Sequence, residues 1–168
     1  MSAFVVDTNV VVTANEKCDH AGPDCVVSCI EALRGIVTDG MAVLDDGMAI
    51  LSEYLDHASL SGQPGVGDAF VKWVWANQAN PARCEVVHVT PRGMTFAEFP
   101  ADPALVGFDP DDRKFVAAAS ASRQAPTVLN AVDSDWEIHR SALEGHGVRI
   151  TTLCADEVRR AIKSRRHD

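Results

Sequence analysis

Acidic residues in this sequence gather where apolar runs end and where helices are expected to begin. Asp7 closes the apolar run at residues 3–7, and Asp133 closes another run at residues 126–133. A carboxylate in such surroundings is costly to bury unless a partner neutralises it. Grouped carboxylates are typical ligands of divalent cations, which can support hydrolysis of phosphate esters. The other acids considered for this site are Glu53, Asp109, Asp111, Asp112 and Asp135.

The elements that would position these acids alternate between strands and helices. Apolar runs predict strands at residues 3–7, 41–46, 83–90, 126–133 and 148–154. Helical spacing predicts helices at residues 23–40, 47–60, 68–80, 109–123 and 134–147, and a basic helix at the C-terminus. Residues 10–12 are expected to pack in a helix or turn, and residues 91–108, rich in Pro and Phe, to be irregular. This order predicts a single α/β domain over residues 1–168, with helices on both faces of a parallel sheet.

The predicted topology brings the acids to one edge of the sheet. Ligands of such folds bind beyond the carboxyl ends of the strands. Asp7 and Asp133 each end a predicted strand there, and Asp112 lies in the first turn of the helix at residues 109–123. Glu53 lies in the middle turn of the helix that follows the second strand. If the two strands that end in acids are neighbours, these carboxylates share a single site.

Most of the acids also have a purely structural interpretation, which the sequence leaves open. Asp109 precedes Pro110, the pattern of an N-cap followed by proline at the first helical position. Asp111 and Asp112 would then complement the positive end of the helix dipole. Helix capping and solvent exposure would account for the remaining acids, Asp135 and Glu53. Asp7 has no comparable structural explanation, because strand ends rarely need a carboxylate within an apolar run.

Considered together, the acids favour a metal site. Two carboxylates about 4 Å apart repel each other by roughly 1–4 kcal/mol, depending on the local dielectric. A proton or a divalent cation would relieve the repulsion among several of them. No Cys or His lies beside these positions, so the ligands would be oxygens, which select Mg²⁺ or Mn²⁺ before Zn²⁺.

Four segments of the sequence resemble, in order, the acidic motifs of PIN-domain nucleases, including the bacterial PIN-domain ribonucleases. They are "VVDTNVVV", "ILSEYLD", "DPDDRKFVAAA" and "VLNAVDSDW", and "HGVRITTL" resembles the last strand of that family. The resemblance therefore covers nearly the whole chain. It implies a three-layer α/β/α fold around a five-stranded parallel sheet and an endoribonuclease that uses Mg²⁺ or Mn²⁺.

The resemblance also assigns residues to roles. It places Asp7, Glu53, Asp112 and Asp133 in the metal-binding quartet, with Asp135 as a fifth acid and Asp109 in support. Thr8 and Asn9 match the polar pair that orients the first acid. The family usually has a hydroxyl residue and then a polar residue before its fourth acid, whereas this chain has Ala131 and Val132 there, with Asn130 one step earlier. Either Asp133 or Asp135 could therefore dominate metal binding.

The family's substrates and partners extend the prediction to RNA and proteins. The net charge of −9 argues against a nonspecific binder that works by covering phosphates with cations. Residues 156–168, however, carry five Lys or Arg against three Asp or Glu. The candidates for RNA contacts are Arg113, Lys114, Arg159 and Arg160, and cations that complement a helix C-terminus are the alternative interpretation of the tail. Many bacterial members are toxins held by a small antitoxin, so the resemblance makes an antitoxin a candidate partner. The long helix pair and residues 91–108 could equally serve a homodimer.

Composition indicates an ordinary globular domain with no membrane partner. Apolar residues make up 46% and charged residues 23% of the chain, and no apolar stretch approaches the length of a membrane span. The N-terminus lacks the pattern of a signal peptide, which favours the cytoplasm. The five cysteines are accordingly predicted to be reduced thiols. Cys18, His20, Cys25 and Cys29 match no common zinc spacing and are interpreted as ordinary residues rather than ligands.

Two other classes of function compete with the nuclease. An aspartyl-phosphate phosphatase of similar topology would have a second Asp two residues after Asp7, where this chain has Asn9. A signalling receiver would need an acceptor Asp after the third strand, and "EVVHVTPRG" contains none. A non-catalytic PIN-fold binding module is the third alternative, although it would have no reason to retain acids that repel one another.

Overall fold

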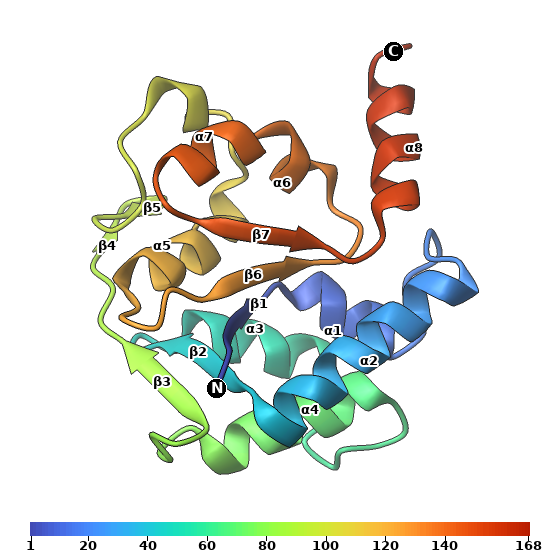
Figure 1. The fold of residues 1–168 in the computed structure, drawn as a ribbon, viewed down its shortest axis with the longest axis vertical. Helices are drawn as coiled ribbons and strands as arrows, with labels where there is room; N and C mark the ends of the chain where they lie inside the picture. Colours follow the sequence, from blue (N-terminus) through green and yellow to red (C-terminus); the bar gives the residue numbers. More distant parts are fainter.

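A five-stranded parallel sheet forms the centre of the molecule, with strand order β3-β2-β1-β6-β7 (Figure 1). The strands are β1 Ala3–Val6, β2 Met41–Asp45, β3 Cys84–Val87, β6 Thr127–Asn130 and β7 Arg149–Thr152. This computed structural model describes all residues 1–168. The predicted α/β class and the three-layer α/β/α arrangement with five parallel strands are confirmed.

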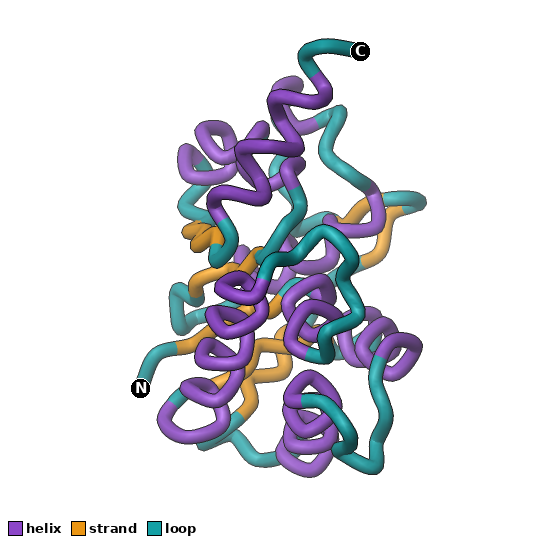
Figure 2. The backbone as a smooth tube through the Cα atoms, turned by 90° about the vertical axis from the view of Figure 1, so that its right-hand side faces the viewer, coloured by secondary structure: helices purple, strands orange, loops and turns teal.

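Helices cover both faces of the sheet (Figures 1 and 2). They are α1 Thr8–Ala14, α2 Pro23–Asp39, α3 Ala49–His57, α4 Val66–Asn77, α5 Arg113–Ala121, α6 Ser134–Ile138, α7 Arg140–Gly145 and α8 Ala155–Arg165. Because crossovers are right-handed, the connections that lead from β1 through β2 to β3 lie on one face, and those that lead back to β6 and β7 lie on the other. None of these helices combines the length and the apolar composition that a membrane crossing requires.

The core continues through the sheet to the edge where β1 and β6 end. Val5, Val6 and Val128 are buried on strands covered from both sides, as their continuous apolar runs predict. Tyr54 is also buried, and its hydroxyl donates a 2.5 Å hydrogen bond to the carbonyl of Val6. This bond fixes α3 against the end of β1, which is the edge where the sequence predicts the acids.

Two segments before α5 differ in structure from the sequence prediction. Residues 91–108 are not wholly irregular, because β4 Pro91–Arg92 and β5 Thr95–Phe96 form a short hairpin, with Gly93 at φ +60° in its turn, and Pro103–Leu105 forms a 3₁₀ turn. The helix predicted from residue 109 begins as the 3₁₀ turn Pro110–Asp112 and becomes α-helical at Arg113.

The helix predicted at residues 134–147 is divided at His139 into α6 and α7. His139 is the C-cap of the first helix and the N-cap of the second. Its ring lies close to the main-chain oxygen of Asp135 and meets Phe108 edge to face. Packing against a segment distant in sequence therefore interrupts a pattern that is locally helical.

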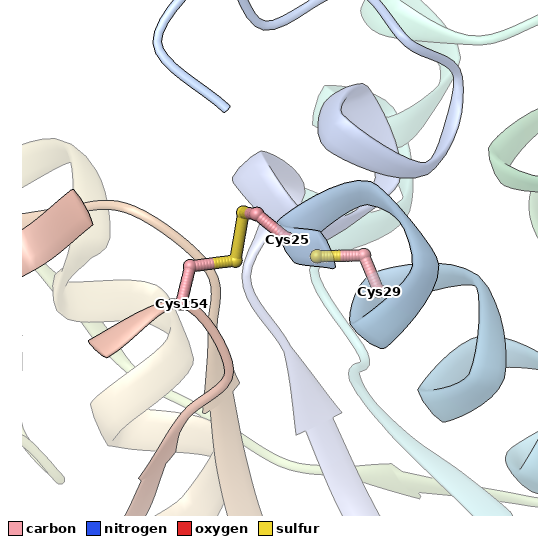
Figure 3. Close-up of side chains that lie close together, drawn as sticks. All are labelled: Cys25, Cys29 and Cys154. Carbon is pink, nitrogen blue, oxygen red and sulfur yellow. A yellow bond between two sulfur atoms is a disulfide. The ribbon is translucent and has the colours of Figure 1, made fainter. Parts of the chain in front are cut away.

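Cys25 and Cys154 form a disulfide, so the prediction that all five cysteines are reduced thiols is wrong (Figure 3). Cys25 lies near the start of α2, and Cys154 is the N-cap of α8. The pair is separated by 129 residues and meets only because β7 ends beside the start of α2. Cys18, Cys29 and Cys84 are free.

Candidate metal centre

Asp7 and Asp133 occupy equivalent positions at the ends of neighbouring strands. Asp7 follows β1 and caps α1, where one carboxylate oxygen accepts a 2.9 Å hydrogen bond from the amide of Asn9. Asp133 caps α6 and accepts a 2.9 Å bond from the amide of Asp135. An N-cap carboxylate uses one oxygen to begin its helix. The start of each helix therefore occupies only one of the two carboxylate oxygens of Asp7 and Asp133.

The side chain of Asp112 approaches these two residues from the start of α5. Carboxylate oxygens of Asp7, Asp112 and Asp133 all lie within 4.8 Å of one another. We refer to these three residues as the carboxylate cluster. Asp112 ends the 3₁₀ turn before α5, and none of the protein's hydrogen-bond donors reaches its carboxylate. The three elements meet because β1 and β6 are adjacent and α5 packs across them.

Two residues that were not predicted as site residues hold the carboxylate cluster in place. The indole Nε1 of Trp136 donates a 2.7 Å hydrogen bond to the second oxygen of Asp7. Asn130 accepts a 3.1 Å bond from the amide of Asp133 and donates a 2.8 Å bond to its carbonyl. The side chain of Asn9 connects the two strands, since it donates to Asn130 and accepts from the amide of Ala131.

The sequence contained some indication that Trp136 and Asn130 belong to the site. Trp136 follows Asp133 by three residues in the fourth acidic segment, and Asn130 precedes it by three. Asn130 is fully buried, and its side-chain amide fixes the backbone of Asp133. The contact of Trp136 with Asp7 spans 129 positions and depends on the fold.

Glu53 lies at the margin of the carboxylate cluster. One of its oxygens accepts a 2.5 Å hydrogen bond from the hydroxyl of Thr8, and the other lies 3.4 Å from the Lys114 ammonium. Thr8 was predicted to orient Asp7, but the structure gives it Glu53 as its partner. Asn9 does orient Asp7, through its backbone amide. Glu53 is therefore the partly neutralised member of the predicted quartet.

Asp135 lies outside the carboxylate cluster. One of its oxygens accepts a 2.8 Å bond from the amide of Asp109, and the other lies 3.2 Å from Nδ1 of His139. Asp109 caps the 3₁₀ turn that ends in Asp112, as its position before Pro110 predicts. Asp135 therefore supports the loop that carries Asp112, and the structure brings Asp133 rather than Asp135 into the group of three.

The basic residues named as RNA contacts have different surroundings. The guanidinium of Arg113 donates to the carbonyls of Val106 and Phe108, so this side chain stabilises the loop before α5. Lys114 is largely buried and faces Glu53. On α8, Arg159 and Arg160 are exposed and pair with acids one turn earlier on the helix. Of the four basic residues predicted to contact RNA, only Arg159 and Arg160 are accessible to a large ligand.

Burial and mutual repulsion disfavour full ionisation of the carboxylate cluster. Burial raises the pKa of Asp7 to about 7, although the hydrogen bonds from Asn9 and Trp136 oppose the rise. Burial, together with repulsion from Asp7 and Asp133, raises the pKa of Asp112 to about 9. Both groups would therefore release their protons readily only when another positive charge replaces them.

The donor set fits a hard divalent cation. A pocket of about 360 Å³ opens on the carboxylate cluster and is lined mainly by oxygen-bearing side chains. The oxygen-bearing residues of the lining include Asp7, Asn9, Glu53, Asp109, Asp111, Asp112 and Asp133. Cys18 and His57 also line the pocket, so the expectation that no Cys or His lies beside the acids is wrong. The carboxylate of Asp112 has no protein donor, and oxygen ligands of this type suit Mg²⁺ and Mn²⁺. Asp7, Asp112 and Asp133 could hold such an ion, with Glu53 beside it.

Comparison with known proteins finds no matching family model, curated protein or solved structure.

Replacing Trp136 by Phe is expected to weaken Mg²⁺ binding by about 10- to 100-fold, the usual effect of removing a group that orients a ligand. The substitution removes the hydrogen bond to Asp7 but keeps most of the buried ring. Isothermal titration with Mg²⁺ measures the affinity. Phe108→Leu is the matched control, since Phe108 packs against Trp136 at 5.1 Å between ring centroids without contacting Asp7 by a hydrogen bond. Equal losses of Mg²⁺ affinity in the two variants would mean that Trp136 acts only through packing.

Mg²⁺ is expected to stabilise the folded chain more at about pH 8 than at about pH 6. The raised pKa values of Asp7 and Asp112 mean that the metal-free folded chain binds more protons than the unfolded chain over this range. Its free energy of unfolding therefore falls by about 2–4 kcal/mol as the pH rises. Mg²⁺ restores the lost stability by replacing the protons.

Thermal denaturation with Mg²⁺ or with EDTA at both pH values tests this expectation. In Asp112→Asn, which lacks one of the two shifted groups, the pH dependence should be smaller. A stabilisation by Mg²⁺ that is the same at both pH values in the unchanged chain would contradict the prediction.

Proposed function

We propose that this chain is a divalent-metal-dependent endoribonuclease of the PIN-domain type. The observation that carries the proposal is the carboxylate cluster, in which three acids from three elements converge at the carboxyl edge of a parallel sheet. A fold gains no stability from mutually repelling, partly buried carboxylates. Their retention is explained if a bound cation is part of the protein's activity.

Each residue of the site has a role in this proposal. Asp7, Asp112 and Asp133 would hold Mg²⁺ or Mn²⁺, and the bound ion would activate water and stabilise charge on the phosphodiester. Trp136 and Asn9 fix the orientation of the Asp7 carboxylate, and Asn130 fixes the backbone of Asp133. Glu53 lies beside these three acids, where the hydroxyl of Thr8 and the ammonium of Lys114 hold its carboxylate in place.

RNA is the proposed substrate because a cationic surface begins beside the same sheet edge. α8 starts directly after β7, so it begins at the edge of the sheet that bears the carboxylate cluster (Figure 1). Arg159 and Arg160 are 68% exposed at the side chain and can contact phosphates. An acidic protein of this kind depends on such a local basic surface and on the metal ion to approach a polyanion.

The aspartyl-phosphate alternative gains less support from the same geometry. A phosphoryl group on Asp7 would meet Asp112 and Asp133 directly, and the nearest cation, Lys114, is directed at Glu53. Like charges at this distance disfavour a phosphorylated intermediate. The metal-dependent hydrolase is the function that the arrangement supports best.

Incubation of the purified chain with labelled single-stranded RNA tests the proposal. Cleavage is expected with Mn²⁺ or Mg²⁺, and it should stop with EDTA and return when the metal is restored. The Asp7→Asn variant should be inactive under all three conditions. Cleavage that persists in both EDTA and Asp7→Asn would point to a contaminating nuclease or a different mechanism.

A further inference from the structure

A second cluster of potential ligands lies away from the carboxylate cluster. Cys25, Cys29 and Cys154 are buried, and their sulfur atoms all lie within 4.8 Å of one another. Figure 3 shows the sulfur of Cys29 directed toward the disulfide between the other two. We refer to these three residues as the thiol cluster.

Two helices create the thiol cluster. Cys25 and Cys29 are four residues apart on α2, so they lie on the same face one turn apart. Cys154 caps α8, and its backbone amide donates a 3.2 Å hydrogen bond to the carbonyl of Ala131, which holds it at the end of β7. A disulfide between α2 and α8 needs only two of these cysteines. The third thiol has no part in that link.

Three converging thiols suit a thiophilic cation. Sulfur ligands of tetrahedral Zn²⁺ lie about 2.3 Å from the metal and therefore about 3.8 Å from one another. All three sulfurs of the thiol cluster lie within 4.8 Å of one another, and breaking the S–S bond would let the sulfurs of Cys25 and Cys154 separate to this spacing. Thiolates favour Zn²⁺ over the hard cations expected at the carboxylate cluster. The two sites would therefore select different metals.

The disulfide borders a surface pocket, although Cys25 and Cys154 are each only 3% exposed. A pocket of about 280 Å³ is lined by Cys25 and Cys154. Glu157 and Arg160 line the same pocket. The side chain of Glu157 is 13% exposed, and its carboxylate faces Arg160 and accepts a 3.4 Å hydrogen bond from the amide of Gly22. This pocket is the route by which a small dithiol would approach the S–S bond.

We propose that the thiol cluster has two exclusive states, a disulfide when oxidised and a Zn²⁺ site when reduced. A dithiol supplies two electrons and two protons to the S–S bond, which breaks into the thiols of Cys25 and Cys154, while the dithiol becomes a cyclic disulfide. Zn²⁺ then displaces the protons of the three thiols and forms bonds to their sulfurs. In the reverse direction a small-molecule disulfide takes two electrons from the thiolates of Cys25 and Cys154 and is cleaved to two small thiols, the Cys25–Cys154 S–S bond forms again, Zn²⁺ leaves, and Cys29 takes a proton from water.

Titration with Cd²⁺, a spectroscopic substitute for Zn²⁺, tests the proposal. The chain is reduced with a phosphine, freed of reductant without oxygen, and kept in excess Mg²⁺ so that the carboxylates are occupied. One equivalent of Cd²⁺ is expected to give the ultraviolet charge-transfer absorption of cadmium thiolates, and one equivalent of Zn²⁺ should remove it. The oxidised chain should give no such absorption.

Two variants distinguish the thiol cluster from other cysteines. Cys29→Ser keeps the disulfide pair but should lose about a third of the absorption and bind at least about 100-fold more weakly. Cys84→Ser, which changes a buried cysteine on β3, should behave as the unchanged chain. Equal binding by Cys29→Ser and Cys84→Ser, or a thiolate absorption in the oxidised chain, would overturn the proposal.

A measurement without substitutions covers the case in which Cys29→Ser does not fold. Zn²⁺ should protect the cysteines at positions 25, 29 and 154 of the reduced chain from alkylation, as mapped by mass spectrometry. Cys18 and Cys84 should react at the same rate with and without Zn²⁺. Protection of Cys18 or Cys84 alone, or no protection at all, would count against the site.

Discussion

Asp112→Asn should stabilise the metal-free chain while reducing RNA cleavage by about 1000-fold or more, a loss of about 4 kcal/mol in transition-state stabilisation. The carboxylate of Asp112 meets no protein donor and faces Asp7 and Asp133. At about pH 8 the metal-free chain has to bind a proton at Asp112 in order to fold, because burial and its neighbours raise the pKa of this carboxyl to about 9. An amide of the same shape needs no such proton and can donate a hydrogen bond to Asp133. Removing this cost is worth about 1–2 kcal/mol, which corresponds to an increase of about 2–8 °C in the melting temperature.

The combination of higher stability and lost activity is diagnostic of a functional acid. Thermal denaturation in EDTA at about pH 8 measures the first effect, and RNA cleavage in Mn²⁺ measures the second. Asp111→Asn is the matched control, because its exposed neighbouring carboxylate is not part of the carboxylate cluster. That control should change the stability by no more than about 0.5 kcal/mol. If Asp112→Asn proves active and less stable than the unchanged chain, Asp112 is an ordinary residue of the helix start.

Reduction of the Cys25–Cys154 disulfide should lower the free energy of unfolding by about 2–5 kcal/mol, or the melting temperature by about 5–15 °C. The bond closes a loop across 129 positions of the sequence, so breaking it restores much conformational freedom to the unfolded chain. Urea denaturation with and without a phosphine reductant measures the difference. A chelator in both samples keeps the thiol cluster free of metal.

The Cys154→Ser variant provides the control for this experiment. It lacks the disulfide and should unfold at about the same urea concentration with and without reductant. The unchanged chain in reductant should approach this variant in stability. If reductant has no effect on the unchanged chain, the disulfide does not contribute to the folded state in solution.

Many features of the site could be predicted from the sequence because they depend on local structure. The sequence predicted that Asp7 and Asp133 end strands, and this is how they reach the site. The structure adds that each also caps the helix that follows; the sequence prediction had given the cap of α6 to Asp135 and no structural role to Asp7. The alternation of apolar runs predicted the parallel sheet, and that topology predicted a common edge for the acids. Asp109 before Pro110 predicted the helical turn that carries Asp112.

The choice between Asp133 and Asp135 depended on contacts that have no local signal. Capping of α6 uses the amide of Asp135 as a donor, which directs its side chain to the amide of Asp109 and to His139. Asp133 is left facing Asp7. The sequence pattern does not distinguish the two acids. The position of the loop before α5 decides which of them joins the carboxylate cluster.

The sequence by itself determined the fold class, the order of the acids and the edge of the sheet at which they meet, since strand ends and helix caps are encoded within a few residues. Only the tertiary structure decided that Trp136 orients Asp7, that Arg113 stabilises a loop, and that Cys25 meets Cys154. Each of these contacts joins surfaces that come together when the helices pack on the sheet. Periodicity along the chain carries no information about which side chains meet there.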